Sequence, residues 1–240
     1  MQFLFERDLI GRWSLNTDYL RIFARSIGLS ALTTVITLVL GFPVALWLAL
    51  QPPRRRALLV FLVTVPFWTN LLVRNFAWIL LLRDGGVIDA ALRFLRVSDG
   101  PLGVLYTPLA TQIGLTYSFL PFMILPIYVS LEKIDRRLIE AGFDLGANHW
   151  RVLSRVILPL AKAGIIGGAV LVFIPCLGAF ISPELLGGAK SMMIGNLIQE
   201  QFGQSRNWPF GSALAFVLLA MVLISLRLNK ARARLKGVAR

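Results

Sequence analysis

Side chains that carry covalent chemistry are sparse in this chain. The one cysteine, Cys176, permits no internal disulfide and lies in an apolar run, where we expect a small buried residue. The one histidine, His149, cannot hold a metal ion alone. The sequence contains no glycine-rich phosphate loop, zinc-ligand spacing or Ser/His/Asp grouping. It therefore predicts no catalytic site, metal or cofactor on this chain, and we expect any nucleotide chemistry to take place on another chain.

The composition predicts a membrane protein. Of the 240 residues, 57% are hydrophobic, and the mean hydropathy is +0.73, whereas a soluble domain has about 45–50% apolar residues. The surplus lies in apolar runs of about 20 residues or more, long enough to cross a hydrocarbon core about 30 Å thick. Since backbone groups in lipid must be satisfied within the segment, we expect each run to be a helix.

Five runs meet this description, and we predict an all-α, polytopic fold with about five transmembrane helices. Prolines inside the runs, such as Pro66 and Pro175, imply kinks or local unwinding rather than breaks. The predicted spans cover residues 26–50, 57–82, 107–131, 163–186 and 210–226, within one predicted transmembrane domain over 26–228.

The basic residues predict the orientation of these spans. A triple-arginine loop at 54–56, the 132–160 segment and a tail at 229–240 are basic, whereas the alternate loops hold few Lys or Arg. Because cytoplasmic loops carry the excess of Lys and Arg, we expect these three segments, and so the C-terminus, in the cytoplasm. The net charge of +13 then follows from topology. Nucleic-acid binding is not expected, because the cations flank spans rather than forming a patch.

Residues 1–25 fit this topology poorly. Five spans with a cytoplasmic C-terminus put the N-terminus outside, yet this stretch carries four arginines and is too polar for a sixth span. It also lacks the pattern of a signal peptide. Either an upstream helix is missing from this chain, or the stretch lies along the interface as an amphipathic helix; we expect the first for the ancestral layout and the second here. The apolar face would be Phe3, Leu4, Phe5, Leu9, Ile10 and Trp13.

The 132–160 segment predicts an ordered helix, a glycine turn and a second helix between two spans. A short helix is expected over 134–144, since Glu132 and Asp135 at its start suit the helix dipole. Gly146 allows a turn that a side chain would hinder, and Asn148 suits the N-cap of the second helix. We expect Pro159 to mark the end of that helix or the start of the next span.

An ordered polar segment between two spans indicates a docking surface for a cytosolic partner. Ala141 and Gly142 leave a shallow surface, and Glu140 offers one charge to an arginine of the partner. The alternative is an amphipathic connector that lies on the membrane surface. The apolar anchors of the docking surface would be Leu145, Trp150 and Leu153.

The spacing in this segment resembles the loop that marks permease subunits of bacterial ABC importers. The pattern is Glu-Ala-small, three residues, Gly, nine residues, then aliphatic-x-Leu-Pro, with a glycine here at the usual alanine position. In that family the loop forms a coupling helix that sits in a groove of the ATPase. The resemblance implies a role in ATPase coupling for Glu140, Ala141, Gly142, Gly146, Val156, Leu158 and Pro159.

Further segments resemble the spermidine/putrescine branch of that family. Residues 65–70, followed by Leu72-Val73-Arg74, are similar to its second-span motif. The family usually has six spans, so the absent first helix is a departure from its pattern. The other similar segments are 120–123, 182–190, 193–196 and 207–211.

The resemblance implies a subunit that lines half of a translocation path and works by alternating access in the bacterial inner membrane. Its solute would be a small cation, with spermidine or putrescine favoured. Its partners would be a second permease, two ATPase subunits that carry ATP and Mg, and a periplasmic solute-binding protein. The rival functions are an ABC permease for iron, thiamine or an anion, a stand-alone secondary transporter, and a membrane enzyme.

Four side chains near membrane depth are candidates for the path. Glu184, at the outer end of the fourth predicted span, would ease the passage of a cation; alternatively it reaches water or pairs with Arg74. Trp68 and Tyr117 each adjoin a helix irregularity and offer cation–π faces, although packing or interface anchoring is the alternative. Arg74 is expected to be structural, or to gate the path by exchanging an ion pair between states.

Two groups of glycines are expected to shape the structure. Gly164, Gly167 and Gly168 form a small-residue face, which favours close packing against a neighbouring helix. Gly187 and Gly188, with Gly195, indicate an outer loop that either receives a binding protein or is a plain turn-rich connection.

Overall fold

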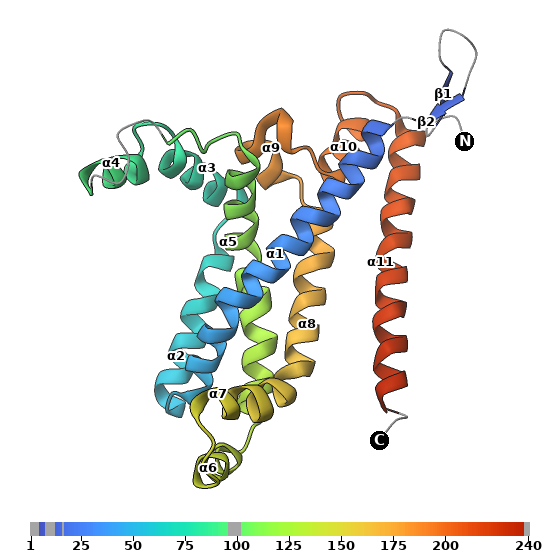
Figure 1. Ribbon diagram of the computed structural model, residues 1–240. Helices are drawn as coiled ribbons and strands as arrows, with labels where there is room; N and C mark the ends of the chain where they lie inside the picture. The colour runs from blue at the N-terminus through green and yellow to red at the C-terminus, as the bar shows by residue number, and fades with distance from the viewer. Residues whose placement is uncertain (1–4, 8–12, 16, 96–101, 238–240) are drawn as a thin grey trace.

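Three helices pack side by side at the centre of the structure (Figure 1). They are α1 (Thr17–Leu50), α5 (Pro108–Glu132) and α8 (Leu158–Leu177). This computed structural model describes residues 5–7, 13–15, 17–95 and 102–237. Within those ranges helices predominate, as the all-α prediction requires, and the strands form one two-stranded ribbon.

The described residues contain three helices that are long and apolar enough to cross a membrane: Tyr19–Leu50, Pro108–Glu132 and His149–Leu177. A bent pair, Pro53–Trp68 and Leu71–Phe94, would make a fourth if it counts as one span. The apolar part of the last helix, Trp208–Leu223, is shorter than these. The count of five spans therefore stays a prediction.

The second predicted span is broken, so its prediction as one helix is wrong. It consists of α2 (Pro53–Thr64), a 3₁₀ turn η1 (Val65–Trp68) and α3 (Leu71–Leu82), and the helices on the two sides of the break are bent by 89°. Pro66 lies in the 3₁₀ turn, where its missing N–H removes a helical hydrogen bond. Asn70 then starts a new helix, because its side chain accepts a bond from the backbone N–H of Leu72 at 2.8 Å.

The prediction extended the fourth span too far, because the helix ends at Leu177 and not at residue 186. α8 stops at Leu177, and residues up to 187 form a separate short helix, α9 (Ile181–Gly187). Pro175 removes one hydrogen bond from the last turn of α8, and Gly178 follows as its C-cap. Glu184 therefore lies in α9 rather than at the outer end of a span.

The other three predicted spans are helical, and two of these helices are longer than predicted. α5 matches the third predicted span within one residue at each end, with Thr107 as N-cap. α1 begins at Thr17, within the predicted 1–25 segment, and α11 (Trp208–Gly237) continues the fifth predicted span into the basic tail. Helical propensity thus carries both helices past the apolar windows that predicted them.

An antiparallel ribbon forms where the sequence predicted an amphipathic helix. β1 (Phe5–Arg7) pairs with β2 (Trp13–Leu15), so the prediction of a helix is wrong for these six residues. Phe3, Leu4, Leu9 and Ile10 lie outside the described residues. Whether this stretch lies on a membrane surface stays a prediction.

A row of buried polar side chains ties α1 to its neighbours. Ser26, Ser30, Thr33 and Thr37 lie at helical spacing on one face of α1 and are buried. Thr33 accepts a hydrogen bond from the Gln112 side chain of α5 at 2.9 Å, and the Ser26 hydroxyl accepts one from a backbone N–H at the start of α10 at 2.8 Å. In an apolar surrounding such bonds stabilise helix contacts modestly and fix which faces meet.

The contact between α5 and α8 confirms the predicted small-residue face at two of its three glycines. A Cβ on Gly164 would collide with the Pro126 carbonyl, and one on Gly168 would lie 2.9 Å from the Met123 sulfur. A Cβ on Gly167 would meet only the Pro126 Cβ, at 4.0 Å. Gly164 and Gly168 therefore allow the two backbones to approach closely.

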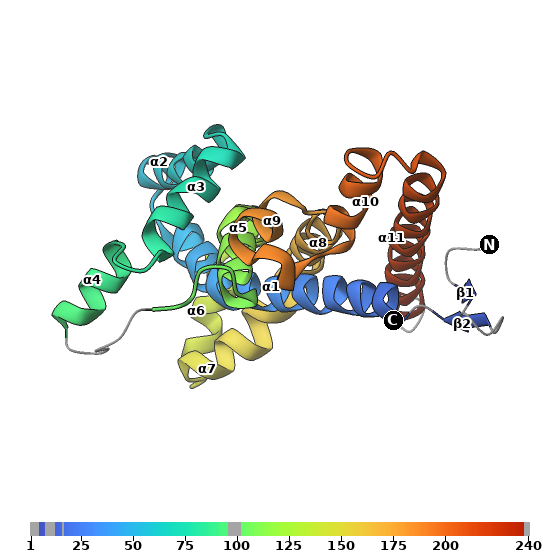
Figure 2. The same ribbon diagram turned by 90° about the horizontal axis from the view of Figure 1, so that it is seen from above.

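Of the remaining helices, α2 and α11 run alongside the central bundle, and the shorter ones gather at its two ends (Figures 1 and 2). One end, here the α6 end, carries α6 and α7; the opposite end, the α9 end, carries α3, α4, α9 and α10. Seen from above, α4 and α11 project on opposite sides of the three central helices (Figure 2). The bounds of the elements not yet given are α4 (Val87–Phe94), α6 (Arg136–Asp144), α7 (His149–Val152), the π turn η2 (Leu153–Ile157), the 3₁₀ turn η3 (Gly188–Ser191) and α10 (Ile194–Phe202).

Candidate functional site

The predicted helix–glycine–helix arrangement of the 132–160 segment is present. Asp135 is the N-cap of α6, and its carboxylate accepts a bond from the Arg137 N–H at 3.0 Å. Gly146 has a φ of +77°, a left-handed conformation that side chains disfavour. Asn148 is the N-cap of α7, as predicted, and accepts a bond from the Arg151 N–H at 2.8 Å. These local signals give the segment a defined shape.

The second helix of the segment does not stop at Pro159. α7 continues through the π turn into α8, so that His149–Leu177 is one apolar helix of 29 residues. Pro159 is the second residue of α8, which agrees with one of its two predicted positions. A proline ring crowds the carbonyl one turn earlier, and the wider π turn just before Pro159 makes room for it.

The surface of the segment is apolar and exposed at its tip. Leu145 and Trp150 are 88% and 71% exposed, as two of the predicted anchors require. Leu153 differs from its prediction, because it packs against the core. Phe143, which was not singled out, packs against the His149 ring in a tilted arrangement, with centroids 5.0 Å apart and 56° between the ring planes.

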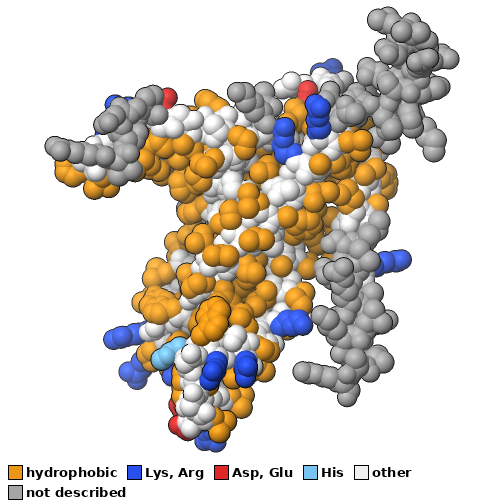
Figure 3. All heavy atoms as spheres, in the orientation of Figure 1, with side chains coloured by type: hydrophobic (Ala, Val, Ile, Leu, Met, Phe, Trp, Pro, Cys, Tyr) orange, Lys and Arg blue, Asp and Glu red, His pale blue; other side chains and the backbone are white. Residues whose placement is uncertain are grey.

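The residues of the recognised pattern divide between surface and support. Glu140, Ala141, Gly146, Leu158 and Pro159 are exposed, whereas Gly142 and Val156 are half-buried. A Cβ on Gly142 would lie 3.3 Å from the Val152 side chain, so a small residue is needed where α6 crosses α7. Figure 3 shows the Lys and Arg side chains that gather around this end, below the hydrophobic middle of the molecule.

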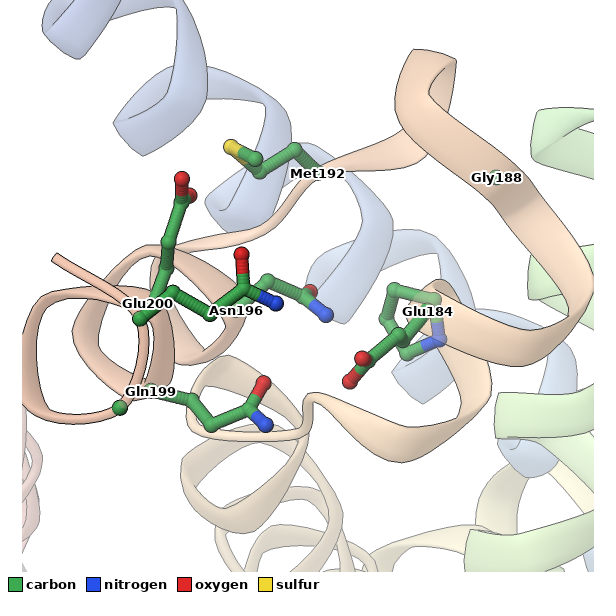
Figure 4. A pocket seen from close by; sticks show the side chains of 9 residues that line it. Glu184, Gly188, Met192, Asn196, Gln199 and Glu200 are labelled. Atoms are coloured by element: carbon green, nitrogen blue, oxygen red, sulfur yellow. The ribbon is translucent and has the colours of Figure 1, made fainter.

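A cavity of about 310 Å³ lies at the α9 end, between α9 and α10. Two carboxylates, those of Glu184 and Glu200, and the side chains of three amide residues line it. In Figure 4 the Glu184 carboxylate lies across the cavity from the Gln199 side chain, whereas the Glu200 side chain leaves the next residue of α10 in a different direction. The lining residues are Pro183, Glu184, Gly188, Met192, Asn196, Gln199, Glu200, Gly203 and Gln204.

Asn196 holds the walls of this Glu184 cavity together. Its amide nitrogen donates to the Phe180 carbonyl at 2.8 Å, and its oxygen accepts from the Met193 N–H at 3.2 Å. Because the side chain is buried and uses both of its polar atoms, it fixes the start of α10 against the start of α9. Hydrogen bonds of this kind determine position more than they add free energy.

The charge of the Glu184 cavity suits a cation. Among the described residues that line it none is basic, so its two carboxylates are not neutralised from within the lining. An ammonium group in the cavity would gain Coulomb attraction from them, which solvent screens in part because Glu184 is exposed and Glu200 half-buried. The sequence prediction missed Glu200, because this residue lies outside the predicted spans. The available signal was its spacing of four residues from Asn196, which places both side chains on one face of a helix.

The structure does not bring the other path candidates to this cavity. Arg74 lines a second cavity of about 290 Å³ between α3, α5 and the turn after α8, and its guanidinium lies over the Phe67 ring, 5.7 Å from the centroid. Its Nε is buried without a hydrogen-bond partner. Since Arg74 and Glu184 line different cavities, the predicted alternative of an Arg74–Glu184 pair is not formed in this structure.

Trp68 and Tyr117 also lie apart from both cavities. Trp68 is 83% exposed at the end of the 3₁₀ turn. Tyr117 packs edge-on against Trp78, with ring centroids 5.6 Å apart, which is the packing alternative. Their proposed contact with substrate stays a prediction.

Comparison with protein families identifies the class of this helical arrangement. Residues 41–234 match the family described as binding-protein-dependent transport system inner membrane component. The chain belongs to this family. It is a multi-pass permease of the inner membrane, and the predicted resemblance to ABC importer permeases is confirmed.

Curated relatives place the chain within the family. It is 43% identical over 219 residues to the spermidine/putrescine transport system permease protein PotB of Haemophilus influenzae, a match that covers 90% of this chain and 77% of the relative. It is 42% identical to PotB of Escherichia coli over 90% of this chain and 80% of the relative. A molybdenum transport system permease protein, ModB of Azotobacter vinelandii, is 27% identical over 80% of this chain and 87% of the relative.

Solved structures show the same fold. A chain in the crystal structure of a bacterial alginate ABC transporter, in complex with an alginate-bound periplasmic protein, superposes with a TM-score of 0.68. The match covers 86% of this chain and 76% of the other, at 17% sequence identity. At that identity the likeness concerns the fold alone.

Proposed function

We propose that this chain is the permease subunit of an ATP-driven importer for a small organic cation, with spermidine or putrescine as the leading solutes. The similarity to PotB permeases over nine-tenths of the chain carries this proposal. The Glu184 cavity supports it independently, because two carboxylates and three amide side chains suit an amine better than an anion.

The ATPases would dock on the 132–160 segment. This segment presents Glu140 beside the exposed Leu145 and Trp150, at the end of the bundle where basic side chains gather. The positive-inside rule places that end in the cytoplasm. The C-terminal helix α11 runs from the α9 end toward the α6 end (Figure 1), which is consistent with a cytoplasmic C-terminus.

Transport would proceed by alternating access without covalent chemistry on this chain. ATP and Mg would bind to two partner ATPases, whose closure moves the 132–160 segment and tilts the helices joined to it. This coupling requires the docked segment to favour different states with and without ATP. A second permease would complete the path, and a periplasmic binding protein would deliver solute at the α9 end.

Reconstitution tests the proposal. The chain is co-expressed with an ATPase, a second permease and a binding protein, copurified, and placed in proteoliposomes loaded with ATP. We expect ATP-dependent uptake of labelled spermidine or putrescine that unlabelled polyamine suppresses and molybdate does not. Uptake without the ATPase, or uptake of iron, thiamine or an anion in place of polyamine, would contradict it.

A further inference from the structure

Two short turns meet at the α6 end. The first turn, residues 50–56, joins α1 to α2 and includes the start of α2, so the three arginines that were predicted as a loop at 54–56 are helical. The second turn, residues 132–136, joins α5 to α6 and leads into the docking surface. The two turns are about 80 residues apart in the chain, so only side-chain contacts hold them together.

Each turn contributes one arginine to the other. Arg136, the first residue of α6, donates from Nη2 to the carbonyl of Leu50 at 2.9 Å. Leu50 is the last residue of α1, where carbonyls lack a partner within the helix. In the opposite direction, Nη2 of Arg56 lies 3.2 Å from Oε1 of Glu132.

Neither Arg56 nor Glu132 stabilises its own helix through the helix dipole. Arg56 is near the N-terminus of α2 and Glu132 is the last residue of α5, so each has the wrong sign for the dipole of its helix. Their contact offsets both unfavourable terms. Arg54 and Arg55, in the same turn, are exposed, whereas Arg56 is half-buried.

Chain connectivity makes these contacts significant for motion. The 132–160 segment is continuous with α5 and α8, and among the residues that the structure describes it reaches α1 and α2 through packing and these two polar contacts. The packing between the turns leaves a small cavity of about 50 Å³, lined by Leu46 and Ala49 on one side and Ile134 and Ile139 on the other. Apolar packing of Ile134 and Ile139 in the same cluster as Leu48 of α1 already joins α6 to α1. The two polar contacts add a directional restraint that limits sliding of α6 along this apolar surface.

We propose that Arg136, Arg56 and Glu132 form a clamp that makes α1 and α2 follow the movement of the 132–160 segment. The inference rests on the proposed function, since it concerns how a docked ATPase drives the helices. The three side chains are positioning residues: they lie at the end of the bundle opposite the Glu184 cavity and act through the helices that they join. Without the clamp, the ATPase would still dock and hydrolyse ATP, while fewer cycles would move solute.

The first test is Arg136→Met in the complete reconstituted importer. We expect ATPase copurification to be unchanged and the uptake per ATP hydrolysed to fall by about fivefold, the lower end of ordinary coupling between sites. Arg137→Met is the matched control, because it removes the same charge from the next position of α6, which is also exposed and does not bond to the Leu50 carbonyl. An unchanged ratio in Arg136→Met, or an equal fall in both variants, would overturn the clamp.

The second test is a charge exchange. Arg56→Glu and Glu132→Arg should each lower the uptake per ATP, and the double variant should restore most of it, because the pair is re-formed with opposite polarity. Arg55→Glu controls for the charge of the loop. Equal ratios in the single variants and the wild type would overturn the clamp, as would a double variant no better than the singles. If wild-type uptake does not depend on ATP at all, the proposed function fails instead, and the two failures are thus distinguishable.

Discussion

The 132–160 segment and the Glu184 cavity lie at opposite ends of the same helices, and they differ in how their shape is specified. The segment is built from local signals: an Asp N-cap, a left-handed glycine and an Asn N-cap, all within 14 residues from Asp135 to Asn148. The cavity depends on contacts between elements, such as the bond from Asn196 to the Phe180 carbonyl and the contact of α10 with Ser26 of α1. Capping residues and turn glycines in a polar segment can therefore be located in a sequence. Within an apolar run, the sequence does not mark where one helix ends and the next begins.

The largest effect is expected at the turn of the segment. Gly146→Val places a β-branched residue at a φ of +77°, where left-handed backbone costs about 1–2 kcal/mol even for ordinary residues. We expect membrane insertion to persist, while ATPase copurification and ATP-dependent uptake fall by about tenfold or more. Both are measured on the purified complex and in proteoliposomes.

Gly85→Val is the matched control for that variant. Gly85 has a φ of +70° at the α9 end, and a Cβ at either glycine would meet no atom within 4 Å. The control should retain ATPase copurification, because its strain lies at the opposite end. Wild-type uptake by Gly146→Val would remove the distinction drawn between the two regions.

The next effect concerns the cavity. Replacing Glu184 and Glu200 together by Gln keeps the shape of the lining and removes both charges, so the KM for spermidine uptake should rise by about threefold to tenfold, with ATPase binding intact. Each single variant should have part of this effect, and a triamine should be affected more than a diamine. Gln204→Asn, a neutral change in the same lining, is the control. Unchanged kinetics in the double variant would exclude the cavity from the solute path.

A smaller effect is expected where α5 and α8 join the two regions. Gly164→Ala forces its Cβ into the Pro126 carbonyl, and overpacking of this kind costs about 1–3 kcal/mol. Thermal unfolding in detergent should show the loss. Gly167→Ala, one turn away, adds a Cβ that meets only the Pro126 Cβ at 4.0 Å, an ordinary contact, and should be neutral or slightly stabilising. Equal stability of the two variants would contradict the close approach of these helices.

The smallest effect is expected in the polar row of α1. Thr33→Val removes the hydroxyl that accepts the Gln112 bond, and hydrogen bonds between membrane helices average about 0.6 kcal/mol. Thr34→Val is the control, since its hydroxyl bonds only within α1, to the Ser30 carbonyl. A midpoint of unfolding that is lower for Thr33→Val alone would confirm the inter-helix role. A larger loss in Thr34→Val would contradict it.

The sequence predicted the fold where length and hydropathy determine it. α5 was located within one residue because a single long apolar run follows a threonine cap. The second and fourth spans were predicted as unbroken because hydropathy does not report the direction of a helix. The short helix α9, with Pro183 and Leu186 buried, follows α8 within the same largely apolar run. A run shorter than a span is as consistent with such a helix as with membrane crossing.

The candidate site was predicted unevenly for the same reason. The segment containing Glu140 and Gly146 follows from residue types and spacing alone. In the cavity Glu184 was identified as the acidic residue of an apolar run, whereas Glu200 was missed, since its position beside Glu184 results from the packing of α9 on α10. An Arg74–Glu184 pair was considered because both residues were expected at a similar depth in the membrane, whereas in the structure they line different cavities.

The helix that passes through the π turn before Pro159 joins the docking surface to the middle of the bundle without a break. The unbroken helix from His149 to Leu177 holds 29 residues, about 43 Å at 1.5 Å per residue, and a tilt of about 5° displaces its far end by about 4 Å. Adding or deleting one residue within it would rotate its two ends by about 100° relative to each other. The residue count of this helix is therefore constrained even at positions where any apolar side chain would fit.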